Sequence, residues 1–245
     1  MIETKNLTKK FYSFTAVDSL DLLIETGEFF GLLGPNGAGK TTTISLLSTL
    51  LLPTEGEILI DGQTLGRNRP DLKRKISVIT QEYSMRQDMN MDEIMEYQGR
   101  LYFMPRKEIK RKTEELLDFC GLLPFRKRTV RKLSGGMKRK LMVCRALLTS
   151  PEILLLDEPT AGMDALSRRQ MWNLLRQLNG KNLTILLTTH YMEEAQSLCN
   201  RVALMDHGKL EEINTPSGLI DGLGKYTVDQ ETPEGAKSHY FHSRE

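Results

Sequence analysis

The chain has few cysteines, few aromatic residues and no long apolar run. Of its 245 residues only 3 are cysteine, and 7% are aromatic. The three cysteines are odd in number, widely spaced and outside any C-x-x-C pair, which indicates reduced thiols rather than a disulfide framework, a zinc site or a redox centre. The longest apolar stretch, residues 44–52, is interrupted by Ser and Thr. It is far shorter than the roughly 20 residues that cross a bilayer, so no membrane span is expected.

The N-terminus and the overall composition are those of an ordinary soluble protein. Residues 1–5 have no basic segment followed by an apolar one, so a secretory signal is not expected and the cytoplasm is the expected compartment. With 39% hydrophobic and 27% charged residues, the composition excludes a disordered chain. The length predicts one large domain, or a core with one subdomain.

Neither sign of charge dominates the whole chain, but the charge is unevenly distributed. The 34 Lys and Arg residues nearly balance the 32 Asp and Glu residues, for a net charge of +2. Residues 105–140 contain 13 Lys or Arg and 4 Asp or Glu, a local charge of +9. Such a region is a solvated helical face, a surface near anionic lipid headgroups, a site for nucleotide phosphates or a nucleic-acid patch. Its shortage of aromatic residues, Phe119 and Phe125 apart, disfavours nucleic acid, and no nucleic-acid partner is expected.

The hydrophobic pattern predicts an α/β fold. Residues 2–28 and 55–63 alternate apolar and polar side chains, which is typical of antiparallel strands. Later apolar runs are short and nearly continuous, as in parallel strands that are buried on both faces. These runs are Phe29–Leu33, Ile76–Thr80, Ile153–Leu156 and Thr184–Thr189, with a further strand expected at Arg201–Met205.

An all-helical insertion is predicted between the second and third of these parallel strands. Asn90 is the expected cap of a helix, and a second helix is expected after Pro105 and ends at Gly121. The first helix is expected to bury Ile94, Tyr97, Leu101 and Tyr102, and the second Ile109, Thr113, Leu116, Leu117 and Cys120. Residues 222–245 are polar, and we expect them to form a short tail that is only partly ordered.

The segment Gly34–Thr42 has the pattern G-x-x-x-x-G-K-[ST]. Its glycines allow the backbone to curl so that its N–H groups point at a polyphosphate, and the helix that follows adds its positive end. Lys40 is expected to contact the outer phosphates and the hydroxyl of Thr41 to ligate Mg²⁺. The pattern lies between a predicted strand and a predicted helix, as this phosphate-binding loop requires.

Two acidic residues end the apolar run Ile153–Leu156. Asp157 stands where a carboxylate at the tip of a strand can hold Mg²⁺, often through water. Glu158 follows directly and can orient the water that attacks the γ-phosphate or accept its proton. An acidic strand end before the turn at Pro159 is the plain structural alternative.

A second anion-binding helix start is predicted at Leu133–Met137. Ser134 and the two glycines after it would present a hydroxyl and free N–H groups at the N-terminus of a helix. One domain that already binds a triphosphate has no evident use for a second such site. Two copies that meet head to tail would use it, because each helix end would then close on the γ-phosphate of the other copy.

Together these ordered motifs resemble those of the nucleotide-binding subunit of ATP-binding cassette (ABC) transporters, over roughly residues 2–220. Gly34–Thr42 matches the Walker A loop, Leu133–Met137 the signature motif and Ile153–Glu158 the Walker B strand. The resemblance implies a P-loop NTPase core with a parallel sheet, an antiparallel β-subdomain and an all-helical subdomain at about residues 85–150, all within an ATPase domain of residues 1–221. It also implies ATP and Mg²⁺ as cofactors.

The resemblance further assigns single residues to roles. Gln81 matches the Q-loop glutamine near Mg²⁺ and the attacking water, and His190 the switch histidine on the γ-phosphate. Asp164 matches the D-loop, which contacts the other subunit. Phe11 matches the aromatic residue that stacks on adenine, with the adjacent Tyr12 as the alternative. The implied catalytic residues are Glu158, His190 and Gln81; the implied metal ligands are Thr41, Gln81 and Asp157; the implied nucleotide-binding residues are Phe11, Gly34, Pro35, Asn36, Gly37, Ala38, Gly39, Lys40, Thr41, Thr42, Ser134, Gly135, Gly136 and Asp164.

One departure from the family pattern points to a branch of it. Met137 stands where Gln is most common, and the run through Leu141 is similar to ABC-2 type exporters such as daunorubicin-resistance systems. A thioether cannot make the hydrogen bonds of an amide, but Ser134 and Gly136 keep their phosphate-facing groups. Residues Met85, Met89, Met91 and Met95 are either an adaptable docking surface for a membrane subunit or filler of a helical core.

The family implies an ATPase that powers separate multi-span membrane subunits from the cytoplasmic side of the membrane, most often as an exporter. The partner in the ATP-bound dimer is a second copy or a paralogous subunit. The alternative is a soluble ABC ATPase that acts in assembly or on nucleic acid. Against that alternative, the chain has a single cassette and no coiled coil or zinc module.

Overall fold

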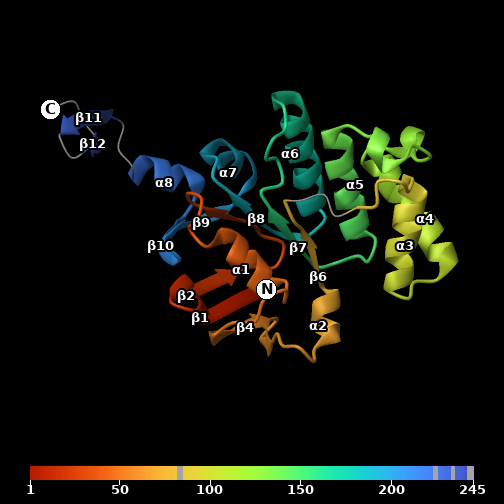
Figure 1. The fold of residues 1–245 in the computed structure, drawn as a ribbon, viewed down its shortest axis with the longest axis horizontal. Helices are drawn as coiled ribbons and strands as arrows, with labels where there is room; N and C mark the ends of the chain where they lie inside the picture. The colour runs from red at the N-terminus through yellow and green to blue at the C-terminus, as the bar shows by residue number, and fades with distance from the viewer. Residues whose placement is uncertain (82–84, 223–225, 233–234, 242–245) are drawn as a thin grey trace.

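The computed structural model describes residues 1–81, 85–222, 226–232 and 235–241, and for residues 222–241 the backbone alone. A parallel sheet forms its centre, with an antiparallel sheet on one side and helices on the other (Figure 1). The predicted α/β class, with its antiparallel and helical additions, is confirmed.

The antiparallel sheet has the strand order β2-β1-β4-β5. As the alternating pattern predicted, the strands come from the first 64 residues. Their bounds are β1 Ile2–Phe11, β2 Phe14–Ile24, β4 Glu55–Ile60 and β5 Gln63–Thr64.

The central sheet has the order β10-β9-β3-β8-β7-β6, with all neighbours parallel except β10 and β9. Its strands are β3 Phe29–Leu33, β6 Ile76–Ile79, β7 Ile153–Asp157, β8 Thr184–Thr189, β9 Arg201–Asp206 and β10 Lys209–Asn214. The predicted parallel strands are thus confirmed. Because their carboxyl ends meet at one edge, the residues that follow β3, β6, β7 and β8 come together there.

Successive residues of β7 pack against two different cores. Leu154 and Leu156 belong to the core shared with the helical side, whereas Ile153 and Leu155 face the antiparallel sheet and α1. All four are at most 2% exposed. A strand that is buried on both faces has no polar position, which explains the unbroken apolar run in the sequence.

Helices cover the sheet and form the insertion. Figure 1 shows α3 and α4 at the end of the molecule opposite α8. The bounds are α1 Lys40–Leu47, α2 Pro70–Arg74, α3 Met91–Leu101, α4 Arg106–Phe119, α5 Gly135–Leu147, α6 Ala165–Asn179, α7 Met192–Leu198 and α8 Pro216–Gly222, with 3₁₀ turns at Leu123–Phe125 and Val130–Lys132. No helix in the described ranges is long and apolar enough to cross a bilayer.

The predicted cap of α3 is confirmed, but of the predicted buried face only Ile94 is confirmed and the other three residues are wrong. Asn90 accepts a hydrogen bond from the N–H of Glu93, whose carboxylate accepts one from the N–H of Asn90. The buried face consists of Met91, Ile94 and Met95, each at most 4% exposed. Tyr97, Leu101 and Tyr102 are 53%, 55% and 41% exposed. Met91, Ile94 and Met95 pack into the core that the insertion shares with the central sheet, and this packing selects their face of the helix.

The same burial decides the role of the methionines. Met85, Met91 and Met95 are at most 8% exposed, and Met89 is partly buried against the same core. Met85, Met91 and Met95 therefore fill the helical core, and the docking surface considered from the sequence is wrong for these three; for Met89 it stays a prediction. In α4 the expected stripe is confirmed, since Ile109, Thr113, Leu117 and Cys120 are buried and Leu116 is partly buried against the core.

The C-terminal segment contains two antiparallel strands, β11 Tyr226–Thr232 and β12 Gly235–Phe241. Residues 223–225, 233–234 and 242–245 lie outside the described residues. The expectation of a partly ordered tail at 222–245 stays a prediction.

Candidate functional site

The loop between β3 and α1 is held by close backbone packing. A Cβ on Gly34 would lie 2.2 Å from the carbonyl oxygen of Met205, and one on Gly39 would lie 2.4 Å from that of Ala16. Gly39 also has a φ of 98°, in the left-handed region. Only glycine fits at both positions, so the loop keeps one conformation between β2 and β9.

Lys40 begins α1 and is only 5% exposed. Its ammonium group donates hydrogen bonds to the carbonyl oxygens of Gly34 and Pro35, each at 2.8 Å. Burial lowers the pKa of Lys40, against the opposing effect of the negative charges of Glu158 and Asp157. A buried ammonium group beside a glycine-rich loop has lost its hydration, so an anionic ligand such as a phosphate stabilises its charge strongly.

Thr41 and Thr188 both donate hydrogen bonds to one carboxylate oxygen of Asp157, at 3.0 and 2.7 Å. Asp157 itself is only 4% exposed. The hydroxyl of Thr188 also accepts a hydrogen bond from the N–H of Glu158, at 3.0 Å. The threonine of β8 therefore fixes both acidic residues at the end of β7. The hydroxyl and carboxylate oxygens placed together here are the donor types that a hard divalent cation prefers.

Glu158 lies directly after β7 and contacts His190, which follows β8. Its carboxylate oxygen is 3.1 Å from Nδ1 of the histidine. The two side chains are 16% and 33% exposed, so both reach solvent. Glu158 has a φ of 46°, a conformation uncommon for residues other than glycine. This turn of the backbone is a local feature that no spacing rule predicts.

A cavity of about 590 Å³ joins these elements, within the range of small-molecule sites. It contains most of the residues predicted for catalysis and for the phosphate loop. Of the predicted residues, Asn36, Gly37, Gly39, Lys40, Thr41, Thr42, Gln81, Glu158 and His190 line it. Segments more than 100 residues apart in the chain thus meet at the carboxyl edge of the parallel sheet (Figure 1).

Other predicted residues lie outside the lining of this cavity. Gly34, Pro35 and Ala38 belong to the loop but do not line it. Ser134 caps α5 by accepting a hydrogen bond from the N–H of Met137 at 3.3 Å, and it is exposed, as is Gly135. The N–H groups of this helix end, which includes Gly136, therefore start on the surface and not in the cavity.

Asp164 likewise caps a helix outside the cavity. It accepts hydrogen bonds from the N–H and the hydroxyl of Ser167, at 2.9 and 2.7 Å. These bonds lower the pKa of Asp164. The cap alone accounts for an acidic residue at this position, and its role toward a second subunit stays a proposal.

The aromatic residue at the cavity is Phe14, at the start of β2, together with Ala16. Phe11 is not part of the lining, and the ammonium group of Lys9 lies 5.1 Å above its ring. Tyr12 is fully exposed in the turn. Adenine stacking by Phe11 therefore stays a prediction, and Phe14 is a candidate that the sequence reasoning missed.

Arg139 is a buried charged residue that the sequence reasoning counted only as part of a basic run. It is 2% exposed and lies on α5. Its guanidinium donates to the carbonyl oxygen of Thr80 at 2.8 Å and to that of Glu158 at 3.3 Å. Thr80 precedes Gln81, so this side chain joins the helix of the signature motif to the backbone of Glu158 and to the residue before Gln81.

The cysteines take no part in the site. All three are free thiols, as predicted. Burial raises the pKa of Cys144 and that of Cys199, which keeps both thiols protonated. Within the described part of the chain, no group of three or more His, Cys, Asp or Glu residues could hold a metal ion.

Comparison with known proteins identifies relatives over nearly the whole chain. The family model for ABC transporters matches residues 17–161. The linearmycin resistance ATP-binding protein LnrL of Bacillus subtilis is 37% identical over 98% of this chain and 78% of its own length. The Nod factor export ATP-binding protein I of Cupriavidus metallidurans is 38% identical, over 90% and 73%. The daunorubicin/doxorubicin resistance ATP-binding protein DrrA of Streptomyces peucetius is 39% identical, over 91% and 68%.

Solved structures agree with this likeness. The dimeric structure of an ATP-binding cassette in a post-hydrolysis state, bound to ADP and Pi, superimposes with a TM-score of 0.78 and 28% identity, over 88% of this chain and 99% of that one. The structure of cbiO1 from Clostridium perfringens, at 23% identity, shows the same fold with a TM-score of 0.83 over 90% of each chain.

Proposed function

This chain belongs to the ABC transporter family and is an ATP-binding, ATP-hydrolysing subunit; from that we propose that it powers an exporter whose membrane-spanning part is made by separate chains. The cavity that brings Lys40, Glu158 and His190 together is the observation that carries the proposal. The relatives named for resistance to linearmycin and daunorubicin and for Nod factor export support the direction of transport.

In the proposed reaction, water attacks the γ-phosphate of ATP, the bond from the γ-phosphorus to the bridging oxygen breaks, and ADP and phosphate are released. The N–H groups of the Gly34–Thr42 loop and the ammonium of Lys40 hold the phosphates, and Lys40 exchanges its two carbonyl partners for phosphate oxygens. Glu158 orients the attacking water and accepts its proton. His190, which contacts Glu158 in this structure, bonds the γ-phosphate, and Gln81 orients the water from the other side.

The residues at the edge of β7 fit a magnesium ion. Thr41 and Asp157, whose oxygens already lie 3.0 Å apart, would hold it with Gln81 nearby. When bound, Mg²⁺ supplies positive charge to the phosphate oxygens.

We propose that two chains form one functional dimer, either two copies or this chain with a paralogue. Support comes from the N-terminal end of α5 at Ser134, which is exposed, does not line the cavity of its own chain and presents the positive end of the helix dipole to the phosphate of another. Asp164 would lie at the same interface. Residues 1–221 would form the ATPase domain, and the helical subdomain at 85–150 would face the membrane subunits on the cytoplasmic side.

The decisive test is Glu158→Gln, which keeps the shape of the side chain but removes its basicity. We expect ATP to be bound and hydrolysis to be abolished, with a dimer that appears only when ATP is added. Glu152→Gln is the matched control, because Glu152 precedes β7 at its other end and is 60% exposed. Undiminished hydrolysis by Glu158→Gln would contradict the assigned role.

The transport role is tested by purifying the tagged chain from detergent-solubilised membranes of its host. Recovery of a multi-span membrane protein at a fixed ratio to the chain supports the exporter proposal. Recovery of only soluble proteins or nucleic acid would leave the ATPase in place and refute the role in export.

A further inference from the structure

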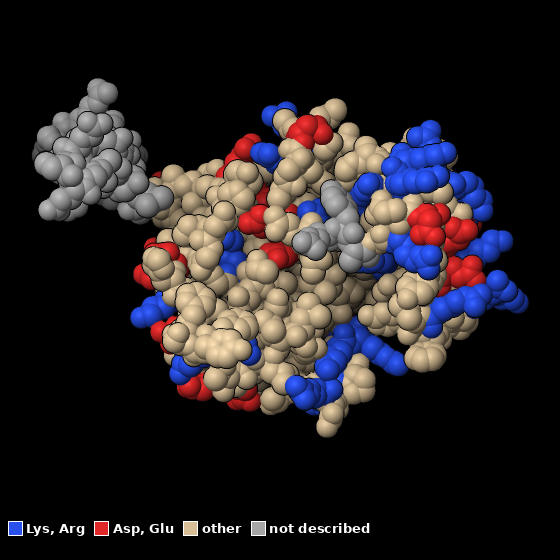
Figure 2. Space-filling view, in the orientation of Figure 1, with Lys and Arg blue, Asp and Glu red and all other residues tan. Residues whose placement is uncertain are grey.

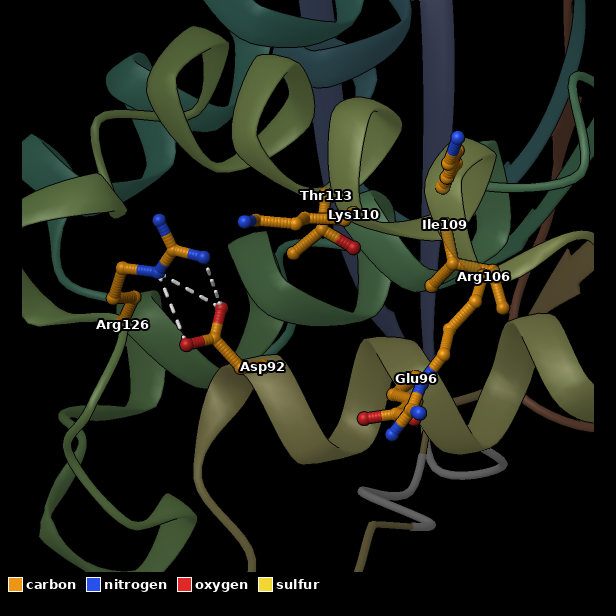
Figure 3. Close-up of a pocket in the computed structure, with 8 residues that line it drawn as sticks. Asp92, Glu96, Arg106, Ile109, Lys110, Thr113 and Arg126 are labelled. Atoms are coloured by element: carbon orange, nitrogen blue, oxygen red, sulfur yellow. Dashed lines mark hydrogen bonds and ion pairs between the residues drawn. The ribbon is translucent and has the colours of Figure 1, made fainter.

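A second cavity lies in the helical insertion, between α3 and α4 (Figure 3). Its volume is about 360 Å³, within the range of small-molecule sites. No residue lines both this cavity and the ATP cavity. It opens in the region where Lys and Arg residues gather on the surface (Figure 2), the basic region noted in the sequence.

Both acidic residues of this cavity are neutralised by cations. The guanidinium of Arg126 contacts Asp92 at 2.8 Å, and the ammonium of Lys127 contacts it at 2.9 Å. The carboxylate of Glu96 contacts Arg100 at 2.6 Å and Arg106 at 3.3 Å. Since each acid already has two cationic partners, neither one offers a free negative charge to a further cation.

The side-chain ammonium groups of two lining residues, Lys107 and Lys110, form no hydrogen bond or ion pair with any part of the chain that the structure describes. In Figure 3, Lys110 lies beside Thr113 and its ammonium points toward the side of the cavity that holds Arg126. The cavity therefore carries excess positive charge next to an apolar wall formed by Ile109 and the methylene groups of the long side chains.

The inner wall also holds a buried hydroxyl group. Thr113 is 3% exposed, and its Oγ1 has no hydrogen-bond partner among the described residues. A threonine in a helix commonly bonds the carbonyl one turn earlier, but this one does not. Buried polar atoms in native proteins almost always have a partner, which points to a ligand that accepts from this hydroxyl.

We propose that this cavity binds a small amphipathic anion that carries one phosphate or carboxylate group on an apolar body. Lys110 bonds the anionic group, Thr113 donates its hydroxyl to it, and Lys107 adds charge at the mouth. The apolar body lies against Ile109. The same chemistry is found in a free organic anion and in the headgroup and upper chain of an anionic lipid, and the two sources are separable by experiment.

The test uses the full chain with saturating Mg·ADP, so that the phosphate loop is already occupied. Binding of n-octyl phosphate below its micelle concentration is measured by calorimetry, with 1-octanol and inorganic phosphate as the two halves of the ligand. We expect octyl phosphate to bind at least tenfold more tightly than either half. Lys110→Gln is expected to weaken binding about tenfold, and Thr113→Val severalfold without lowering the melting temperature. Lys5→Gln, an equal change of charge on exposed β1, is expected to have no effect.

Two vesicle preparations distinguish the sources. Co-sedimentation with phosphatidylglycerol vesicles, absent with phosphatidylcholine vesicles and lost in Lys110→Gln, assigns the site to a lipid headgroup. Binding of octyl phosphate without vesicle binding assigns it to a free anion. Equal binding by the wild type, Lys110→Gln and Thr113→Val, or no binding in either assay, overturns the proposal. A lower melting temperature of Thr113→Val would also overturn it, because the hydroxyl would then have a structural partner.

Discussion

Substitution of Arg139 tests whether its guanidinium positions the residues that follow β6 and β7 at the carboxyl edge of the sheet. Its guanidinium is 2% exposed and bonds the carbonyl oxygens of Thr80 and Glu158. Arg139→Met keeps most of the apolar volume of the side chain but leaves both carbonyls without this donor. A buried acceptor that loses its partner costs about 1–3 kcal/mol. Because two carbonyl groups lose this donor, we expect a destabilisation of about 2 kcal/mol or more.

The same substitution is expected to reduce turnover more than affinity. Arg139 bonds the backbone beside Gln81 and at Glu158, whereas Lys40 bonds the carbonyl oxygens of the phosphate loop. The KM for ATP should therefore change little, while Gln81 and Glu158 lose a common anchor. We expect kcat to fall about tenfold, which corresponds to about 1.4 kcal/mol in the barrier.

Urea unfolding and steady-state ATP hydrolysis measure the two effects. Lys132→Met is the control, since it removes an exposed positive charge close to the same helix. Arg139→Lys should restore part of the stability by supplying one donor. If Arg139→Met unfolds at the same urea concentration as the wild type and keeps its kcat, the guanidinium does not position the site.

Two further predictions concern nucleotide binding. Burial lowers the pKa of Lys40 below its ordinary value of 10.5, so the unfolded chain binds this proton more tightly than the folded chain. In urea, the stability of the ATP-free wild type should therefore increase as the pH rises toward 10.5, and Lys40→Met should lack this pH dependence while its ATP affinity falls at least tenfold. The same increase with pH in Lys40→Met would show that another group causes it. Phe14→Ala should weaken ATP binding severalfold in fluorescence titrations and Phe11→Ala should not, because only Phe14 lines the cavity; the opposite order would restore the assignment to Phe11.

Local patterns predicted the strands and the phosphate loop. The loop at Gly34–Thr42 is recognisable because its chemistry depends on residues that are neighbours in the chain. The apolar runs between Phe29 and Thr189 are recognisable because strands that are buried on both faces have apolar residues at nearly every position. The face of α3 was predicted wrongly for a physical reason. Two faces of this helix satisfy a helical period. One combines Ile94 with Tyr97 and Leu101, and the other combines Ile94 with Met91 and Met95. Only the packing of the whole insertion selects the second face.

Contacts between segments that are distant in the sequence could not be predicted from local sequence patterns. Thr188 bonds Asp157 and the backbone of Glu158 across two strands, but in the sequence it is only one threonine in an apolar run. Arg139 lies between Lys138 and Lys140, which are only partly buried, and nothing local in the sequence distinguishes it from them. The unpartnered hydroxyl of Thr113 is likewise visible only once α3 and α4 are packed together.

The separation of the exposed Ser134 helix end from the cavity around Lys40 has a genetic consequence. In the proposed dimer each ATP site takes its phosphate loop from one chain and its capping helix from the other. If the dimer consists of two copies of this chain, two inactive alleles, one that disables Lys40 and one that disables Ser134, would complement each other when expressed together. Half of the sites in a mixed dimer would then consist of two intact halves, while the other half would carry both defects.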